Sequence, residues 1–390
     1  MHASDPTPAP PGRLHALDNL RAIMMWLGIV LHVVVIYAAG RTPLFWHDRS
    51  RTVLADVAMA YIHAFRMPVF FILAGFFVVM LATTRGTDAM LRNRVQRLAL
   101  PFAVFWPLAF VATGLSVLAF LSLMATGHWG LDESLVPPNA PRGANTIHLW
   151  FVWMLLWFSV IAALLLRLPR QWFAQPARAL VRLGLAPWGF AVLALPLVVT
   201  DMGYPDGFLA PTGSFLPPWN EWVHNGLFFV FGLCVYGQQA TLFERWQRTW
   251  RPHLIAGSLL FVVVGSLVQR QAHPALIAFA YHCCGWLLSF AALGLGLRFL
   301  AARQPVLAYL ADSAYWVYIA HFPFTVLFGA LLYELDWPAI PKILVNIALT
   351  SLVCLASYQL FVRHSWISVL LNGKRHPRAS ALPPAAATAG

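Results

Sequence analysis

The chain has 390 residues, of which 60% are hydrophobic and 10% charged, and its formal net charge is +12. An average soluble domain is roughly a quarter charged, so this composition argues against a soluble enzyme and indicates a protein that lies mostly in lipid. The arginines that carry the charge lie in short spacers between apolar runs, which argues against a nucleic-acid-binding face.

Long apolar runs predict an all-α, polytopic membrane bundle. A spanning helix needs about 20 mostly apolar residues. We predict about ten such helices, at 20–39, 65–83, 99–125, 149–167, 185–200, 222–240, 254–269, 275–297, 306–333 and 341–362. Residues 1–19 read as a polar N-terminal segment, 20–371 as one membrane domain and 372–390 as a disordered cytoplasmic tail. Lys and Arg concentrate in alternate connections, which predicts that both termini face the cytoplasm.

The four cysteines all lie within apolar segments, at Cys234, Cys283, Cys284 and Cys354. No pair has the spacing of zinc ligands, and a disulfide framework would need a soluble, oxidising setting. We therefore read the cysteines as small core residues and expect no metal site.

The first predicted helix carries polar residues along one face. Arg21 and His32 are eleven positions apart, which leaves them ~20° apart around the helix and about 16 Å apart along it. His32 would then lie near the middle of a ~30 Å hydrocarbon layer. Asp18 falls within ~40° of the same stripe and is placed to meet Arg21 one turn later. A histidine at this depth suits either proton transfer near neutral pH or a structural hydrogen bond.

Further polar residues stand at the ends and midpoints of later helices. His63 and Arg66 lie at the outer start of the second helix, and Arg92, Arg94 and Arg97 at the inner start of the third. His148 and Trp150 lie at the outer start of the fourth helix. His321, followed by Pro323, lies deep in the ninth. The three inner arginines are also typical topology residues, and a histidine at a helix start is also a common interfacial hydrogen-bonder. Together, however, these residues place polar groups from both faces at a shared depth. A site reached from two sides of a membrane requires this arrangement.

One outer connection is rich in carboxylates and aromatic residues. Residues 201–221 carry Asp201, Asp206 and Glu221 and no basic residue, with Tyr204 and Trp219 among them. This composition suits either a hydroxyl-rich ligand or an interfacial aromatic belt.

These stretches together resemble the acyltransferase-3 family of integral membrane acyltransferases. Arg21 and His32 match the arginine–histidine signature of that family's first helix, and "FRMPVFFILAGFF", "RVQRLALP", "HLWF" and "YWVYIAHFPF" match further blocks in order. The second block usually has serine before its glycine, whereas this chain has Ala74 before Gly75, which leaves the glycine available for close helix packing. Within the family, the pattern is most similar to the branch that succinylates osmoregulated periplasmic glucans.

The resemblance implies a multi-pass protein of the bacterial inner membrane that transfers an acyl group, succinyl first, from cytoplasmic acyl-CoA to hydroxyls of a periplasmic glucan. Its implied partners are acyl-CoA, the glycan acceptor and membrane lipids, without nucleic acid and without a tightly bound cofactor. The alternatives are acetyl transfer to another cell-surface glycan and, from a different class, glycan or lipid transport.

The resemblance also implies roles for the residues singled out above. His32 would act as general base on the acceptor hydroxyl or as a transient acyl acceptor. Arg21 would hold the pyrophosphate end of CoA or support His32 through Asp18. Arg92, Arg94 and Arg97 would bind the CoA phosphates. Acceptor positioning or thioester-oxygen stabilisation falls to His63, Arg66, His148 and His321, and Trp150 and Glu221 are further substrate-binding candidates.

Overall fold

A computed structural model describes residues 11–40, 44–138, 140, 143–169, 171–204, 206–302 and 304–377. Within these ranges the chain is helical and has no strand, which confirms the predicted all-α class. The α-helices are α1 (Pro11–Val34), α2 (Val53–Arg85), α3 (Thr87–Arg94), α4 (Leu100–Thr126), α5 (Trp150–Leu165), α6 (Gln171–Leu185), α7 (Gly189–Asp201), α8 (Trp219–Val235), α9 (Gln239–Gln269), α10 (Pro274–Phe299), α11 (Pro305–Tyr333), α12 (Ala339–Ser357) and α13 (Trp366–Asn372).

The number of candidate spans in the described chain is close to the predicted number of about ten. Eight helical stretches of the described chain are long and apolar enough to cross a membrane, or up to nine if the bent pair α6 and α7 counts as one span. The predicted segments 222–240 and 254–269 both lie in one helical stretch, Trp219–Gln269, and the predicted segment 185–200 lies mainly in α7, which meets α6 at 116°. The polytopic bundle is confirmed, and the orientation of its termini stays a prediction.

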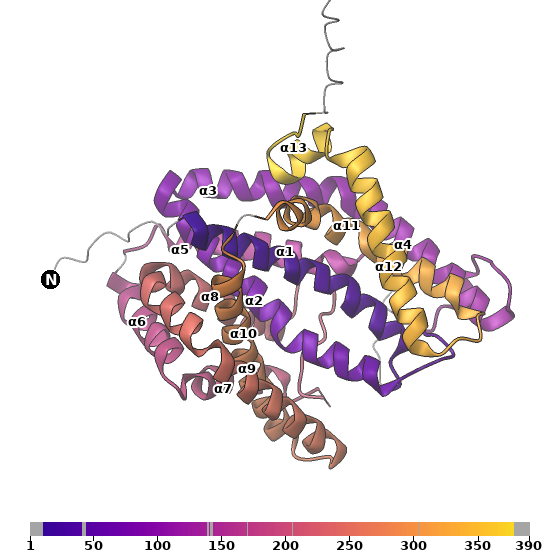
Figure 1. The fold of residues 1–390 in the computed structure, drawn as a ribbon, viewed down its shortest axis with the longest axis horizontal. Helices are drawn as coiled ribbons and strands as arrows, with labels where there is room; N and C mark the ends of the chain where they lie inside the picture. The colour runs from indigo at the N-terminus through magenta and orange to yellow at the C-terminus, as the bar shows by residue number, and fades with distance from the viewer. Residues whose placement is uncertain are drawn as a thin grey trace, which may run out of the picture.

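The helices gather in two groups around a shared centre (Figure 1). Helices α6 to α10 lie together at the lower left of the view, whereas α4, α11, α12 and α13 lie toward the upper right. Helices α1 and α2 run between them: α1 packs against α11, and α2 packs against α8 and α10. Because α1 also packs against α10, a side chain on α1 can meet side chains of either group.

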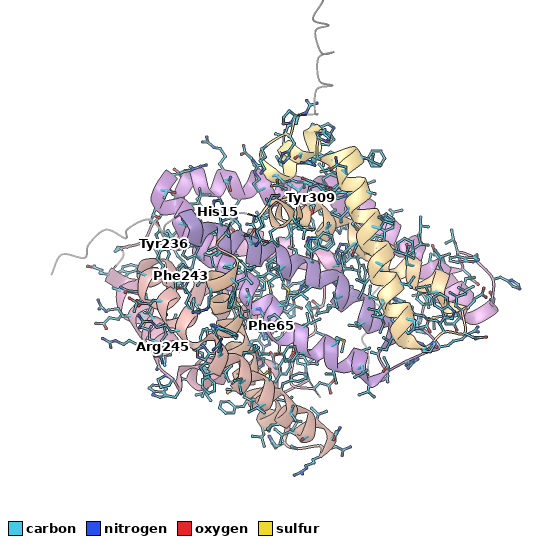
Figure 2. All side chains as sticks on the ribbon, in the orientation of Figure 1. His15, Phe65, Tyr236, Phe243, Arg245 and Tyr309 are labelled. Atoms are coloured by element: carbon cyan, nitrogen blue, oxygen red, sulfur yellow. The ribbon has the colours of Figure 1, made fainter. Side chains whose placement is uncertain are left out.

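Glycines allow α2 and α8 to cross closely. A Cβ atom at Gly75 would lie 2.8 Å from the backbone nitrogen of Leu233, and one at Gly232 would overlap the backbone of Ile72. Gly75 is the glycine that the sequence analysis expected to serve close packing. Next in the chain, the ring of Phe76 packs against Tyr236 and Phe243, with ring centroids 5.5 and 5.6 Å away. Figure 2 labels Tyr236 and Phe243.

The ends of the chain differ in part from the predicted segments. Helix α1 begins at Pro11, so part of the predicted polar segment 1–19 is helical, whereas residues 1–10 lie outside the described residues. Of the predicted tail 372–390, only residues up to 377 are described, and Lys374 there pairs with Asp312 of α11 at 2.7 Å. The free cysteines, at Cys234, Cys283, Cys284 and Cys354, lie in helices and are buried or half-buried.

Candidate active site

Three histidines from different helices meet inside the bundle. The ring centroid of His32, near the end of α1, lies 5.2 Å from that of His321 in α11 and 6.5 Å from that of His148. His148 and His321 are themselves 5.2 Å apart, and both are buried. Each of the three was singled out from the sequence, and the fold brings all of them to one place.

Hydrogen bonds fix which ring nitrogens of two of these histidines are free. The Nε2 atom of His148 lies 3.1 Å from the carbonyl oxygens of both Tyr318 and Ile319, and Nδ1 of His321 lies 3.0 and 2.8 Å from the carbonyl oxygens of Val317 and Tyr318. Because a carbonyl oxygen only accepts, these ring nitrogens carry the proton in the neutral rings. The opposite nitrogens, Nδ1 of His148 and Nε2 of His321, are buried without a hydrogen-bond partner in the described chain.

The proline after His321 explains one of these bonds. In a helix, the carbonyl of Ile319 would accept from the backbone N–H of residue 323, but Pro323 has no N–H. The Nε2–H of His148 donates to the Ile319 carbonyl instead, and the Tyr318 hydroxyl donates to the His148 carbonyl at 2.7 Å. Directly before His148, the β-branched Ile147 adopts a φ of 47°, which is sterically strained. The backbone therefore holds His148 in a fixed and costly position against α11.

Arg66 brings a buried cation beside the histidines. Its Nε donates to the Met24 carbonyl at 2.8 Å, and its side chain is only 5% exposed. The guanidinium occupies space that a side chain at Gly28 would fill: a Cβ there would lie 2.5 Å from Nη2. Among charged and titratable groups, Arg66 is one of the electrostatic neighbours of both His32 and His321. The site thus combines three imidazoles with one fixed positive charge.

Asp18 and Arg21 pair with each other, as the sequence predicted, at 3.3 Å. Both side chains are about half exposed, so they lie at the edge of the bundle rather than beside His32. Arg94 is a close electrostatic neighbour of Arg21, and its buried Nε has no hydrogen-bond partner in the described chain. A bound anion would stabilise the two like charges of Arg21 and Arg94.

The other two arginines of that group behave differently. Arg92 is exposed. Arg97 donates through Nη1 to the carbonyl oxygens of Val369 and Leu370, and thereby binds the last turn of α13. A cation at a helix C-terminus is stabilising, so Arg97 has a structural contact that the sequence analysis did not foresee.

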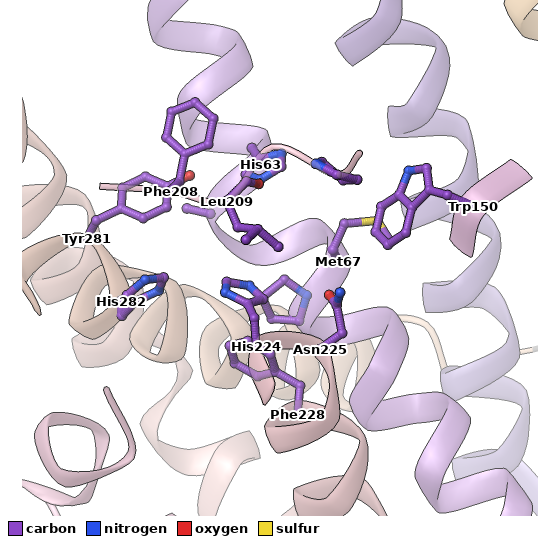
Figure 3. A pocket seen from close by; sticks show the side chains of 13 residues that line it. His63, Met67, Trp150, Phe208, Leu209, His224, Asn225, Phe228, Tyr281 and His282 are labelled. Carbon is purple, nitrogen blue, oxygen red and sulfur yellow. The ribbon is translucent and has the colours of Figure 1, made fainter. Parts of the chain in front are cut away.

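A cavity lies between α2, α8 and α10 (Figure 3), and the three clustered histidines are not among the residues that line it. Both His63 and Trp150 line it, as does Met67, the residue after Arg66. His63 donates through Nε2 to the Leu209 carbonyl at 3.2 Å and packs on Phe208. The cavity is therefore walled in part by the connection 201–218, which the sequence analysis considered for a hydroxyl-rich ligand.

Glu221 does not line this cavity. It is buried, and its Oε1 accepts from the backbone N–H of Thr212 at 2.7 Å, which ties the same connection to α8. The opposite wall of the cavity carries His224 and His282, which contact the carboxylate of Asp201. The sequence analysis did not single out these histidines. His282 lies within an apolar run, and the criterion that selected His321 would have found it.

Comparisons with known proteins point to one family. A family model described as "Acyltransferase domain" matches residues 14–361. Among curated proteins, "Glucans biosynthesis protein C" from Salmonella gallinarum (strain 287/91 / NCTC 13346) and from Salmonella paratyphi B are each 25% identical to this chain, over 94% of it and 96% of the relative. No solved structure matches the chain.

Proposed function

The chain belongs to the acyltransferase-3 family, and on that premise we propose that it transfers a succinyl group from acyl-CoA to a hydroxyl of a periplasmic glucan. Membership of this family makes it a multi-pass membrane acyltransferase and favours acyl transfer over the transport of an unmodified glycan. The named relatives are glucan biosynthesis proteins, which supports a glucan as acceptor and a bacterial inner membrane as location. The observation that carries the proposal is the meeting of His32, His148 and His321 inside the bundle, with Arg66 as an electrostatic neighbour of His32 and His321.

His32 is the proposed general base. Among the described residues it forms no hydrogen bond that would tie up a ring nitrogen, unlike His148 and His321, and it remains partly exposed. Its nitrogen would take the proton of the acceptor hydroxyl while the hydroxyl oxygen attacks the thioester carbonyl. The carbon–sulfur bond then breaks, the CoA thiolate leaves, and the imidazolium returns the proton to the sulfur. The products are an ester and free CoA.

The neighbouring groups support this step. Arg66 would stabilise the thioester oxygen as it gains charge, or bind the free carboxylate of a succinyl group. The unpaired nitrogens of His148 and His321 accept hydrogen bonds, so they would hold an acceptor hydroxyl by its proton or by that of a neighbouring hydroxyl. Their tautomers are already fixed by backbone carbonyls, so they need no rearrangement when substrate arrives.

Acyl-CoA is proposed to enter at the end of the bundle that carries Arg21 and Arg94. Arg21 and Arg94 lie close enough for their charges to interact, and Asp18 neutralises only one of them. A CoA phosphate or pyrophosphate between them would relieve that repulsion. Arg97 contributes less directly in this proposal, because its guanidinium already binds α13.

The test is CoA release by the purified protein in nanodiscs, with succinyl-CoA or acetyl-CoA and a β-glucan. His32→Ala should lower the glucan-dependent rate by about 10²–10⁴-fold, which is the usual contribution of a general base. His15→Ala is the matched control, because His15 lies on the same helix and is exposed. A rate unchanged in His32→Ala would refute the assignment, and equal use of both donors would refute succinyl selectivity.

A separate measurement distinguishes a base from an acyl acceptor. An acyl-histidine would form without glucan, and it would exchange labelled CoA into succinyl-CoA. The general-base mechanism has no acyl-enzyme, so it predicts no such exchange until glucan is added.

A further inference from the structure

Two histidines that line the cavity, His224 and His282, belong to a second cluster of side chains able to bind a metal. Nδ1 of His224 in α8 lies 3.1 Å from Oδ2 of Asp201, the last residue of α7, and Nε2 of His282 in α10 lies 3.0 Å from the same oxygen. One ligand atom from each of the three residues falls within 4.8 Å of the others. Three separate helices thus converge on one point.

The hydrogen bonds within the described chain do not satisfy all the buried polar atoms of this cluster. His282 is 3% exposed, yet its Nε2 makes no aligned hydrogen bond, even to the carboxylate oxygen 3.0 Å away. A buried ring nitrogen without a partner is costly, which indicates that something else engages it. Asp201 is fully buried, and among the described residues its ion-pair partners are these two histidines and no lysine or arginine. A buried carboxylate that has no lysine or arginine partner is stabilised by a bound cation.

The ligand set fits a divalent metal of the zinc class. Zinc sites with catalytic or ligand-binding roles commonly use histidines and a carboxylate and leave a fourth position open. The separations of 3.0 and 3.1 Å between the carboxylate oxygen and the two ring nitrogens are close to the edge of about 3.3 Å of a tetrahedron with zinc–ligand bonds of about 2.0–2.1 Å. The backbone N–H of Leu209 donates to Oδ2 of Asp201 at 3.0 Å, and such a bond orients a ligating carboxylate.

The cavity supplies the open side. Both His224 and His282 line it, and Figure 3 shows their rings on the wall that faces His63. A metal ion held by the three residues would therefore present its fourth position to a molecule in the cavity.

We propose that Asp201, His224 and His282 bind a divalent zinc-class metal ion whose fourth coordination position opens into the cavity. This proposal departs from the expectation of no metal site, which rested on the spacing of the cysteines. It does not depend on the proposed acyl transfer, because it concerns binding by a separate set of residues.

The first test measures zinc in the wild-type protein. The full chain is purified with an affinity tag that contains no histidine, stripped with a chelator, reloaded with ZnCl₂ and passed through a desalting column. We expect about one zinc ion per chain by mass spectrometry. Cobalt(II) added to the stripped protein should give the intense visible absorption of a tetrahedral ion, and zinc should abolish it. An X-ray absorption spectrum of the zinc form should show two imidazole ligands, an oxygen ligand and no sulfur.

Variants identify the residues. Asp201→Asn and His282→Gln should each lower bound zinc to well under half of the wild-type content, and the variant with Asp201→Asn, His224→Gln and His282→Gln together should bind none. His63→Gln is the matched control, because His63 lines the same cavity but donates to a backbone carbonyl. It should keep the full zinc content.

Two results would overturn the proposal. One is a wild-type protein that retains no zinc and shows no cobalt spectrum. The other is equal uptake by the wild type and the triple variant, which would reduce Asp201 to a hydrogen-bonded link between helices. Where a variant fails to fold, the X-ray absorption spectrum of the wild type tests the proposal by itself: two imidazole ligands support it, and any other number contradicts it.

Discussion

The Nε2–H of His148 donates to the carbonyl of Ile319, the carbonyl that Pro323 leaves without a helical N–H. The relationship joins the start of α5 to the middle of α11 and fixes the tautomer of a site histidine. It also explains why a proline stands in the interior of a buried helix, where it would otherwise cost about 3 kcal/mol.

Pro323→Ala should lower the rate of acyl transfer without lowering the stability of the protein. The alanine restores an N–H that competes for the Ile319 carbonyl and leaves His148 with the Tyr318 carbonyl alone. A lost hydrogen bond costs about 1 kcal/mol, so the rate of acyl transfer should fall roughly fivefold. The apparent melting temperature should stay equal or rise. Both quantities are read from one preparation by CoA release and a thermal melt.

Pro107→Ala is the control for this prediction. Pro107 also lies inside a helix, α4, but its side chain is exposed and it lies outside the histidine cluster. It should leave the rate unchanged. Equal losses of rate in both variants would mean that helix geometry, and not the bond to His148, matters.

Gly28→Ala should impair the site by displacing Arg66. The new Cβ would lie 2.5 Å from Nη2, so the guanidinium must move, which breaks its bond to the Met24 carbonyl. Hydrogen bonds to charged groups are worth about 1.5–3 kcal/mol, which corresponds to a loss of roughly 10–100-fold in kcat/KM.

A double-mutant cycle checks that the effect passes through Arg66. In an Arg66→Ala background, Gly28→Ala should cost little more, because there is no guanidinium to displace. Gly114→Ala in α4 is the control, because no atom lies within 4 Å of the added Cβ. Additive losses from Gly28 and Arg66 would contradict this explanation.

Local sequence patterns predicted the contacts that depend on residue spacing within one helix. The Asp18–Arg21 pair follows from their spacing of one helical turn, and the close crossing at Gly75 follows from a glycine within an apolar helix. Membrane depth selected His321, and depth together with the stripe shared with Arg21 and Asp18 selected His32; the fold then placed the two rings 5.2 Å apart.

Contacts between residues far apart in the chain could not be predicted from the sequence. Asp201, His224 and His282 stand 23 and 58 positions apart along the chain, so no local spacing marks them as a set. The contact of Arg97 with α13 joins residues 272 and 273 positions apart. The sequence divided Trp219–Gln269 into two segments, because hydropathy falls at the polar residues between them, whereas the chain there stays helical from α8 through a short 3-10 turn into α9.

Arg94→Gln should weaken binding of acyl-CoA and leave the chemical step intact. Arg94 has a buried Nε without a partner and lies near Arg21, so a phosphate is the proposed occupant. A charge-assisted contact is worth about 1.5 kcal/mol or more, which predicts a rise of roughly tenfold or more in the KM for acyl-CoA. The kcat should stay within about twofold, because uniform binding affects KM alone.

Arg92→Gln removes the same charge two residues away, from an exposed position. Its KM should match that of the wild type. A rise in KM of similar size for both variants would indicate a general effect of positive charge on a negatively charged substrate rather than a defined contact.

The two lysines of the chain, Lys342 and Lys374, form a matched pair for the last prediction. Nζ of Lys342 lies 2.9 and 3.0 Å from the two carboxylate oxygens of Asp48, and both side chains are fully buried. Lys342→Met leaves the Asp48 carboxylate buried and unpaired, which should lower the free energy of unfolding by about 3–5 kcal/mol. The apparent melting temperature in detergent should fall by about 5–10 °C.

Lys374 pairs with Asp312 at 2.7 Å, but its side chain is 55% exposed. Water screens such a pair, so Lys374→Met should shift the free energy of unfolding by less than about 1 kcal/mol. Adding Asp48→Asn to Lys342→Met should recover part of the lost stability, because the unpaired charge is then gone and only hydrogen bonds are missing. If the double variant melts below Lys342→Met, the ion pair is not the source of the loss, and the hydrogen bond from the Ser50 backbone to Asp48, 2.7 Å long, becomes the contact that holds the connection between α1 and α2.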